Sequence, residues 1–188
     1  QSTMLMANHR ENVEEAIAGD IIGIYDTGNY QIGDTLSTRK ETLFFEPLPT
    51  FPPELFALVT PKDTMKAKQF QKGVSQLAQE GAIQVYRNEY NEVIIGAVGQ
   101  LQFEVFQYRL ENEYNAKIRM DRLEFSLARW VHAEDFDTVK KVLDSRTMLV
   151  FDHFDRPLIL FANQFTLNYF AEKNPDIKLL EALDVKQF

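Results

Sequence analysis

Seven basic residues are the strongest candidates for chemistry in this sequence. Four lysines fall within one short segment, and three arginines lie on or near adjacent predicted strands: Lys62, Lys66, Lys68, Lys72, Arg119, Arg122 and Arg129. Lysine and arginine bind phosphate oxygens, so these side chains would form a nucleic-acid contact if they converged on one surface. The alternative is an ordinary solvated helix face, because lysine and glutamine are also good helix formers.

No arrangement of residues in the sequence matches a catalytic or metal site. The chain contains no cysteine, which excludes disulfides, thiolate metal ligands and cysteine nucleophiles. It also contains no phosphate-binding loop, dinucleotide-binding glycine motif or nucleophile elbow. His9, His132 and His153 lie far apart in the chain, and Glu111 and Glu113 would point apart on a helix. We therefore predict no catalytic residue, no metal site and no cofactor bound by this chain.

The segment Asp152–Asp155 places two carboxylates and a histidine close together in the sequence. It lacks the alternating carboxylates and the central glycine of a calcium-binding loop. We predict a solvated turn between two strands instead. Trp130, the only tryptophan, is predicted to lie in the core rather than to form a stacking platform.

Composition limits the class of protein. The chain has 188 residues, of which 45% are apolar and 15 are phenylalanine, so it can bury a sizeable core. Its net charge of −8 argues against a protein that coats nucleic acid by bulk charge, while a local basic patch remains compatible with an acidic body. No apolar run approaches the roughly 20 residues of a membrane helix, and no leader peptide opens the chain, so we expect a soluble, cytoplasmic protein.

The first part of the chain, residues 1 to 46, is typical of β structure. Ile21–Tyr25 and Tyr30–Ile32 resemble strands joined by a turn at Asp26–Asn29, where glycine and asparagine tolerate positive φ. Because these few strands cannot close a barrel, we expect an incomplete domain. The alternative is a small extension that packs on the next domain. The proline-rich segment Pro47–Pro53 is predicted to be a semi-rigid linker.

The rest of the chain, residues 54 to 188, indicates an α+β fold. A strand, a helix that begins around Thr60-Pro61-Lys62-Asp63, two strands, a helix and a strand form a ferredoxin-like split βαββαβ unit. Its first strand is Glu54–Val59. After the first helix come two strands at Ile83–Arg87 and Val93–Ala97, a helix at Gln100–Tyr114 and a last strand at Lys117–Leu123. The pattern then repeats over Glu124–Val131, Asp135–Leu143, Thr147–Phe151, Leu158–Phe161, Gln164–Glu172 and Ile177–Leu183.

The helix from Gln100 to Tyr114 is apolar on two sides. One stripe contains Leu101, Val105 and Tyr108, and the other contains Phe103, Phe106, Leu110 and Tyr114. A helix on an open sheet needs only one buried stripe. We therefore predict that the second stripe is the contact between the two βαββαβ units.

Several segments in unbroken order resemble the bacterial release factor 3 family of translational GTPases. They are Gly19–Gly23, Ile32–Thr35, Pro53–Phe56, Lys68–Gly73, Gln76–Ala82, Gly96–Val105 and Ala128–Val131. The turn Gly99–Phe103 would also suit elongation factor G and its relatives. Its combination with Arg129-Trp130 indicates the release factor 3 family in particular.

The resemblance implies a protein with a nucleotide-binding domain, a β-barrel second domain and a C-terminal α/β domain. Residues 1 to 46 would be the last barrel strands, and residues 54 to 188 the C-terminal domain. Such a factor binds the ribosome, both its RNA and its proteins, and promotes departure and recycling of class I release factors. The GTPase domain, with its GTP and Mg²⁺, is not in this chain, so we expect no enzymatic activity here.

On this expectation the seven basic residues are candidates for ribosomal contacts, and a second partner is the protein's own GTPase domain; no membrane is involved. Five residues are interpreted as a structural motif that sets the start of the long helix: Gly96, Gly99, Gln100, Leu101 and Phe103. A hinge to the nucleotide domain is the functional alternative for the turn Gly99–Phe103.

Other functions remain open. One alternative is a fragment of an elongation factor G-like GTPase. Another is a ferredoxin-like regulatory domain that binds a small molecule, although Val59–Lys62 offers no glycine-rich loop for a ligand. A free-standing enzyme is the third, and it lacks nucleophiles and ligand clusters. Fold alone would not separate these functions.

Overall fold

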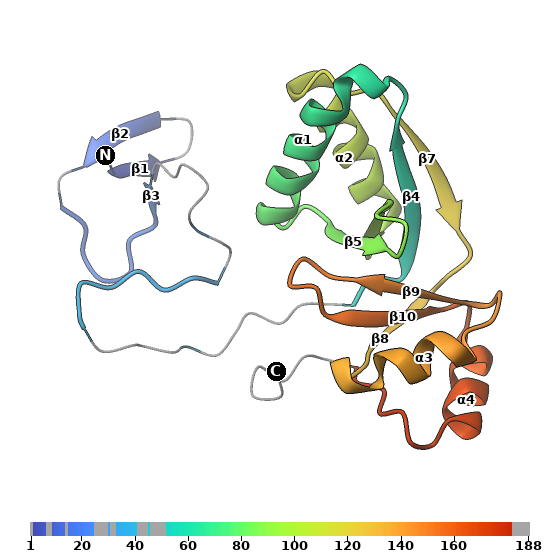
Figure 1. The fold of residues 1–188 in the computed structure, drawn as a ribbon. Helices are drawn as coiled ribbons and strands as arrows, with labels where there is room; N and C mark the ends of the chain where they lie inside the picture. Colours follow the sequence, from blue (N-terminus) through green and yellow to red (C-terminus); the bar gives the residue numbers. More distant parts are fainter. Residues whose placement is uncertain are drawn as a thin grey trace. The chain divides into compact units, whose positions relative to one another are not determined.

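The computed structural model describes residues 2–6, 9–13, 15–24, 30, 33–40, 45 and 52–181. The chain divides into two compact units, Gln1–Glu46 and Pro47–Phe188, and each is described here by itself (Figure 1). None of the helices in the described residues is long and apolar enough to span a membrane.

The first unit contains a three-stranded antiparallel sheet in the order β2-β1-β3. Its strands are β1 (Ser2–Met6), β2 (His9–Val13) and β3 (Ile22–Ile24). The middle of the strand predicted at Ile21–Tyr25 is therefore confirmed. The turn predicted at Asp26–Asn29 and most of the strand predicted after it lie outside the described residues, as does most of the proline-rich segment.

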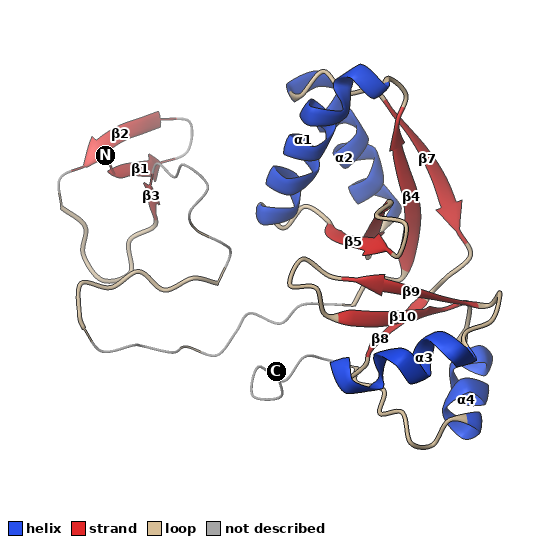
Figure 2. Cartoon of the chain, in the orientation of Figure 1, coloured by secondary structure: helices blue, strands red, loops and turns tan. Residues whose placement is uncertain are grey.

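The second unit is built on one seven-stranded antiparallel sheet in the order β7-β4-β6-β5-β9-β10-β8 (Figure 2). Its strands are β4 (Leu55–Pro61), β5 (Gln84–Asn88), β6 (Val93–Ala97), β7 (Ile118–Leu123), β8 (Leu127–Trp130), β9 (Thr147–Phe151) and β10 (Pro157–Phe161). Numbered within the first half, β7-β4-β6-β5 is the order 4-1-3-2 of a ferredoxin-like unit, as the sequence predicted.

Two helices cover one face of this first half-sheet (Figure 1). They are α1 (Ala67–Gln79), preceded by the short helix η1 (Thr64–Lys66), and α2 (Gln100–Glu113). Phe70, Val74 and Leu77 of α1 are buried, as are Phe103 and Phe106 of α2. The two helices approach closely because α1 carries a glycine at the crossing. A Cβ atom at Gly73 would lie 2.5 Å from a methyl carbon of Leu110.

The first helix begins later than the sequence predicted. Thr60 and Pro61 still belong to β4, and Pro61 pairs with Ile118 of the edge strand. Asp63 is the N-cap of η1, and its carboxylate accepts a hydrogen bond from the backbone N–H of Met65 at 2.9 Å. The expected Thr-Pro start was wrong because Pro61 is the last residue of β4, two positions beyond the last pair of β4 with β6 at Val59↔Val93, and the end of a strand can accommodate proline.

The second half repeats the arrangement in reduced form. Its helices are α3 (Phe136–Val142), preceded by η2 (Ala133–Asp135), and α4 (Gln164–Lys173). The final strand predicted at Ile177–Leu183 is, in the described residues, only a single bridge between Leu180 and Trp130 of β8. That bridge still gives the order 4-1-3-2, with the fourth strand shortened to one pair.

The halves join through the sheet and not through α2, so the predicted contact is wrong. β5 pairs with β9 at Arg87↔Phe151 and Asn88↔Val150. The faces without helices share a third cluster that includes Phe56, Tyr86 and Ile94 from one half and Val150, Leu158 and Leu160 from the other. Strands β6 and β10 are consequently buried on both faces. Leu101, Val105 and Tyr108 of α2 are instead exposed.

The turn between β9 and β10 is only partly solvated, which corrects the sequence prediction. His153, Phe154 and Asp155 are exposed, whereas Asp152 is buried. Its carboxylate accepts hydrogen bonds from the backbone N–H groups of Phe154 at 2.9 Å and Arg156 at 3.0 Å. The Arg156 guanidinium binds the other oxygen through Nε at 2.8 Å. Asp152 therefore fixes the turn.

Candidate interaction surfaces

A lysine surface follows the start of α1 and consists of Lys62, Lys66, Lys68 and Lys72. Lys68 and Lys72 are four residues apart, so they lie on the same exposed face of the helix, opposite Phe70 and Val74. Lys62 is exposed in the loop after β4, and Lys66 is half-buried at the N-cap of α1. The structure thus places Lys68 and Lys72 on one face of α1, with Lys62 and Lys66 just before the helix.

The charges of the lysine surface have no acidic partner among the described residues. The basic residues with described ion pairs are Arg109, Arg119, Arg129, Lys140, Arg146 and Arg156. An unpaired exposed ammonium can bind a phosphate without first breaking an ion pair. The lysine surface is therefore better suited to an anionic partner than Arg119 and Arg129 are.

Lys117 extends the lysine surface, and the sequence analysis missed it. The backbone N–H of Lys62 donates to the carbonyl oxygen of Lys117 at 2.9 Å, so the two residues lie side by side where β4 ends and β7 begins. Lys117 is exposed. The ferredoxin-like order places the first and last strands of a unit next to each other, so the predicted topology contained the signal for this pair.

Arg119 and Arg122 lie on opposite faces of the edge strand β7. Arg119 forms an ion pair with Asp121 at 2.7 Å. Arg122 lies over the ring of Phe103, with its guanidinium carbon 4.4 Å from the ring centroid, so it packs on α2. Residues three apart on a strand point to opposite sides, and these two arginines therefore do not share a surface.

Arg129 is separate from the other candidates. It lies on β8, which is the opposite edge of the sheet from β7, so the predicted adjacency of the three arginines is wrong. Its side chain is only 13% exposed and pairs with Glu181 at 2.9 Å. Another of its nitrogens donates to the carbonyl oxygen of Ala128. This arrangement ties residue 181 to the sheet.

The motif around Gly99 positions the start of α2. Gly99 is the N-cap, and the side-chain oxygen of Gln102 accepts hydrogen bonds from the backbone N–H groups of Val98 at 2.8 Å and Gly99 at 3.0 Å. The Gln102 side-chain amide also donates to the carbonyl oxygen of Ala82. Gln102 was not among the predicted motif residues, although a glutamine three residues after an N-cap is a known capping pattern.

Gly96 and Gly99 differ in what they require. A Cβ atom at Gly96 would lie 2.8 Å from the ring carbons Cβ and Cγ of Pro53 and 3.0 Å from Tyr86. A Cβ atom at Gly99 would meet nothing within 4 Å, and its φ of −138° is open to any residue. Gly96 is therefore a packing requirement, while the fold of the described residues does not require glycine at position 99.

An apolar stripe on α2 is the second notable surface, and it consists of Leu101, Val105 and Tyr108. Their exposed fractions are 69%, 43% and 67%, so all three face solvent in this unit. The neighbouring Glu104 is also exposed. Farther along α2, the guanidinium of Arg109 binds Glu80 and Glu113, and its hydrogen bond to Glu113 lowers the pKa of the Glu113 carboxyl. The apolar stripe, with the carboxylate of Glu104 beside it, suits a protein partner better than RNA.

The described residues contain no cluster of three or more side chains that could hold a metal ion.

Comparison with known proteins gives a consistent result. Residues 45–171 match the model of the class II release factor RF3 C-terminal domain, and residues 1–39 match elongation factor G domain 2. Peptide chain release factor 3 of Streptococcus uberis is 54% identical over 96% of this chain, and that of Enterococcus faecalis is 57% identical over 94%. The chain spans 35% and 34% of these two relatives, or about a third of their length.

The fold also resembles a solved structure. A crystal structure of a Thermus thermophilus protein matches with a TM-score of 0.50 at 18% sequence identity, covering 70% of this chain and 22% of that one. At this identity the similarity concerns the fold alone.

Proposed function

The chain belongs to the class II release factor RF3 family, and we propose that it is the ribosome-contacting C-terminal part of a cytoplasmic translation-termination factor. The observation that carries the proposal is the lysine surface, whose charges are unpaired in the described residues of a protein with a net charge of −8. Ribosomal RNA presents a dense array of phosphates, which such a surface would bind through counterion release. The family match supports the ribosome as the partner, because the relatives are peptide chain release factors.

In the full-length protein we propose that a preceding domain binds GTP and Mg²⁺ and hydrolyses the nucleotide. The present chain would contribute no catalytic residue. Its role would be to hold the factor on the ribosome while class I release factors depart and are recycled. The first unit, which matches elongation factor G domain 2, would be part of a β-barrel domain that links the GTPase domain to the C-terminal domain.

The lysine surface can be tested by replacing Lys66, Lys68 and Lys72 with alanine. We expect the variant to bind purified ribosomes at least about tenfold more weakly than the unaltered chain at moderate salt, because three phosphate contacts are lost. Co-sedimentation with ribosomes measures the effect. A matched control replaces Lys40, Lys141 and Lys178, which removes the same charge from other exposed positions and breaks none of the ion pairs described. Equal weakening by both variants would show that only net charge matters and would contradict a specific lysine surface.

The apolar stripe on α2 is proposed to contact the protein's own GTPase domain. The chain spans only 35% of its Streptococcus uberis relative, and a covalently linked domain binds a weak surface at high effective concentration. Glu104 beside the stripe argues against RNA as its occupant. Leu101 is 69% exposed and adds little to the core of the unit, so a contact with another domain would explain an apolar residue at this position of the motif.

Serine substitutions at Leu101, Val105 and Tyr108 test this contact. We expect the free energy of unfolding of the present chain to change by less than about 0.5 kcal/mol per site, because all three side chains are exposed. In the full-length protein we expect faster hydrogen exchange in α2 than in the unaltered protein. Substitution of Gln69 and Gln76, which are exposed on the other helix α1, serves as the control. Identical exchange in α2 with and without the stripe would contradict the docking.

A further inference from the structure

The seven-stranded sheet of the second unit has two edges, and in the described residues only one of them is bridged by another segment. At the β8 edge, the backbone N–H of Trp130 donates to the carbonyl oxygen of Leu180 at 3.0 Å, and the N–H of Leu180 donates to that of Trp130 at 2.9 Å. At the other edge, β7 pairs with β4 on one side and with no described strand on the other (Figure 1). We call the unpaired side of β7 the open edge.

The register of β4 and β7 shows which backbone groups point to the open edge. In an antiparallel pair, residues that exchange hydrogen bonds with the opposite strand alternate with residues whose N–H and C=O groups point away from it. The N–H of Lys62 donates to the carbonyl oxygen of Lys117 at 2.9 Å, so Lys117 belongs to the first set. Ile118, Met120 and Arg122 therefore direct their N–H and C=O groups away from β4.

The open edge presents a regular row of backbone donors and acceptors. The six residues of β7 pair with β4 in an unbroken register without a bulge, and none of them is proline. Bulges, prolines and covering segments are common means of preventing pairing at an edge strand. An extended polypeptide matches such a row, because it offers complementary N–H and C=O groups at the same spacing. The backbone of the open edge therefore suits a peptide strand better than RNA.

The side chains along the open edge are mostly basic. Lys117, Arg119 and Arg122 outnumber the one acid of the strand, Asp121, and Lys62 lies beside Lys117. Arg119 is paired with Asp121, whereas Lys62, Lys117 and Arg122 form no ion pair with a described acidic residue. The five side chains carry a net charge of +3, from four positive and one negative. Two copies of β7 would repel each other, while an acidic strand would be attracted.

Arg122 is held where a partner strand would pass. Its guanidinium carbon lies 4.4 Å from the centroid of the Phe103 ring, and Phe103 is buried while Arg122 itself is exposed. Side chains directly opposite each other on paired strands have Cβ atoms about 4.5–5.5 Å apart, and opposite charges at such positions stabilise the pair. A carboxylate opposite Arg122 would form an ion pair without displacing one that is described.

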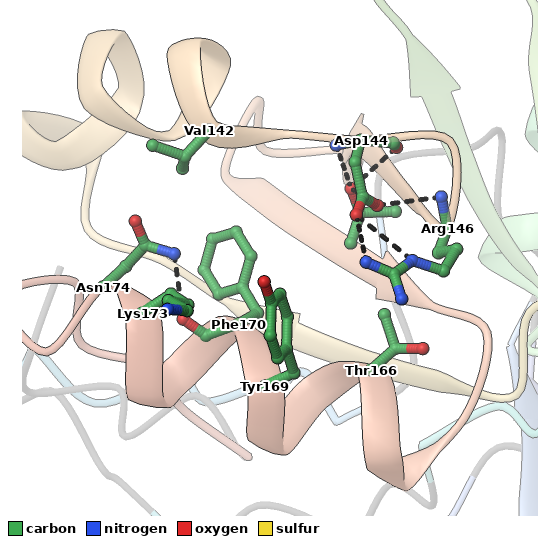
Figure 3. Close-up of a pocket in the computed structure, with 9 residues that line it drawn as sticks. Val142, Asp144, Arg146, Thr166, Tyr169, Phe170, Lys173 and Asn174 are labelled. Carbon is green, nitrogen blue, oxygen red and sulfur yellow. Dashed lines mark hydrogen bonds and ion pairs between the residues drawn. The ribbon is translucent and has the colours of Figure 1, made fainter.

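A pocket of about 350 Å³ between the end of α3, the turn that follows it and α4 has no comparable set of free groups (Figure 3). The guanidinium of Arg146 binds the carboxylate of Asp144 at 2.7 Å. Arg146 and Lys173 also lie over the ring of Tyr169, 5.5 Å and 5.8 Å from its centroid. The polar and aromatic groups of this pocket therefore bind one another.

We propose that the open edge binds an extended acidic segment of a partner protein as an additional strand, with one carboxylate opposite Arg122 and others near Lys117 and Lys62. The partner's backbone pairs with Ile118, Met120 and Arg122, and its carboxylates provide specificity. The site is separate from the proposed RNA contact, because it is defined by the backbone of β7 and not by the lysines of α1. A second copy of this chain and single-stranded RNA are the competing occupants.

The test uses the present chain and a fluorescein-labelled peptide of eight residues that alternates glutamate with threonine. A second peptide of the same sequence is N-methylated at every residue, so it keeps the carboxylates and loses its backbone donors. Fluorescence anisotropy measures binding of both peptides and of a labelled hexauridylate. We expect the first peptide to bind with a Kd below about 1 mM, and the N-methylated peptide to bind at least about tenfold more weakly.

Two variants separate the backbone contribution from the charge. Because the N–H of Met120 points to the open edge, Met120→Pro removes a donor without breaking a hydrogen bond to β4, and edge strands accept proline at such positions. We expect this variant to weaken peptide binding about tenfold or more, and Arg122→Gln to weaken it about two- to fivefold. Circular dichroism shows whether each variant is folded, and the Arg122 variant and the N-methylated peptide remain informative if Met120→Pro is not.

Amide hydrogen exchange followed by NMR gives the most direct readout. The peptide should slow exchange at the N–H groups of Ile118, Met120 and Arg122 by about tenfold or more, because these groups become hydrogen-bonded. Arg119 and Asp121, whose N–H groups point to β4, should change less. The ribosome assay and the lysine variant play no part in this test, so this proposal and the proposed function can fail separately.

Equal binding of the two peptides would show that charge alone attracts them, and it overturns the proposal. Absence of peptide binding, or unchanged exchange at the three outward N–H groups, overturns it as well. If Arg122→Gln weakens binding of the hexauridylate and not of the peptide, the edge is an RNA contact instead. If sedimentation velocity shows a dimer that Met120→Pro separates, the occupant is a second copy of this chain and the proposal is wrong.

Discussion

Replacing Asp152 with alanine is expected to lower the free energy of unfolding by about 3 kcal/mol. The carboxylate is buried and accepts hydrogen bonds from two backbone N–H groups, of Phe154 and Arg156, as well as from the Arg156 side chain. Removing it leaves these donors without their acceptor in a site with little access to water. The indole Nε1 of Trp130 also lies 3.5 Å from the carboxylate, so the loss reaches β8.

Urea unfolding of the present chain measures this effect. Alanine at the neighbouring, exposed His153 is the control and should change the free energy of unfolding by less than about 0.5 kcal/mol. Asp152→Asn keeps one acceptor oxygen but loses the charge, so it should lie between the two. A neutral effect of Asp152→Ala would mean that the turn is held mainly by its backbone, contrary to the hydrogen bonds described above.

Two glycines of one motif are expected to respond very differently to the same substitution. Gly96→Ala should lower the free energy of unfolding by about 1–3 kcal/mol, because the new methyl group would collide with Pro53 and Tyr86 in the shared core. The proline ring and the tyrosine ring are both rigid, and Tyr86 is buried, so neither can move aside without disturbing the cluster. Burial also raises the pKa of the Tyr86 hydroxyl, which keeps this side chain neutral.

Gly99→Ala should lower the free energy of unfolding by no more than about 1 kcal/mol, since its methyl group would enter open space and only the weaker N-cap preference of alanine is lost. The same urea experiment compares both variants. A large loss of stability at position 99 would show that the N-cap needs glycine after all. If the Gly99 variant is stable but impairs the full-length protein, the requirement for glycine lies in contact with a partner.

Much of the fold could be predicted from the sequence because its signals are local. The strand Val93–Ala97 and the helix that begins at Gln100 are bounded by glycines and a change of hydrophobic period, and the structure confirms both. The joining of the two halves could not be predicted, because the pairing of β5 with β9 depends on residues about 60 positions apart. For the same reason, the sequence analysis wrongly assigned the contact between the halves to the second apolar stripe of α2.

The candidate site was predictable only in part. A lysine spacing of four on a helix indicates a shared face, and Lys68 and Lys72 do share one. The sequence does not reveal which basic side chains already form ion pairs, because the acidic partner can lie far away in the chain. Arg129, for example, pairs with Glu181, 52 positions away. The open edge of β7 could not be predicted either, because the ferredoxin-like order leaves β7 and β5 at the two ends of the first half, and only the pairing of β5 with β9 leaves β7 open.

The most direct test of the proposed function is the salt dependence of ribosome binding by the present chain and by its Lys66/Lys68/Lys72→Ala variant. Because each phosphate contact contributes roughly 0.7–0.9 to the slope of log affinity against log salt concentration, we predict that the variant's slope is shallower by about two to three. Equal slopes for the two proteins would mean that these lysines do not contact phosphates, and would contradict the assignment of the lysine surface to ribosomal RNA.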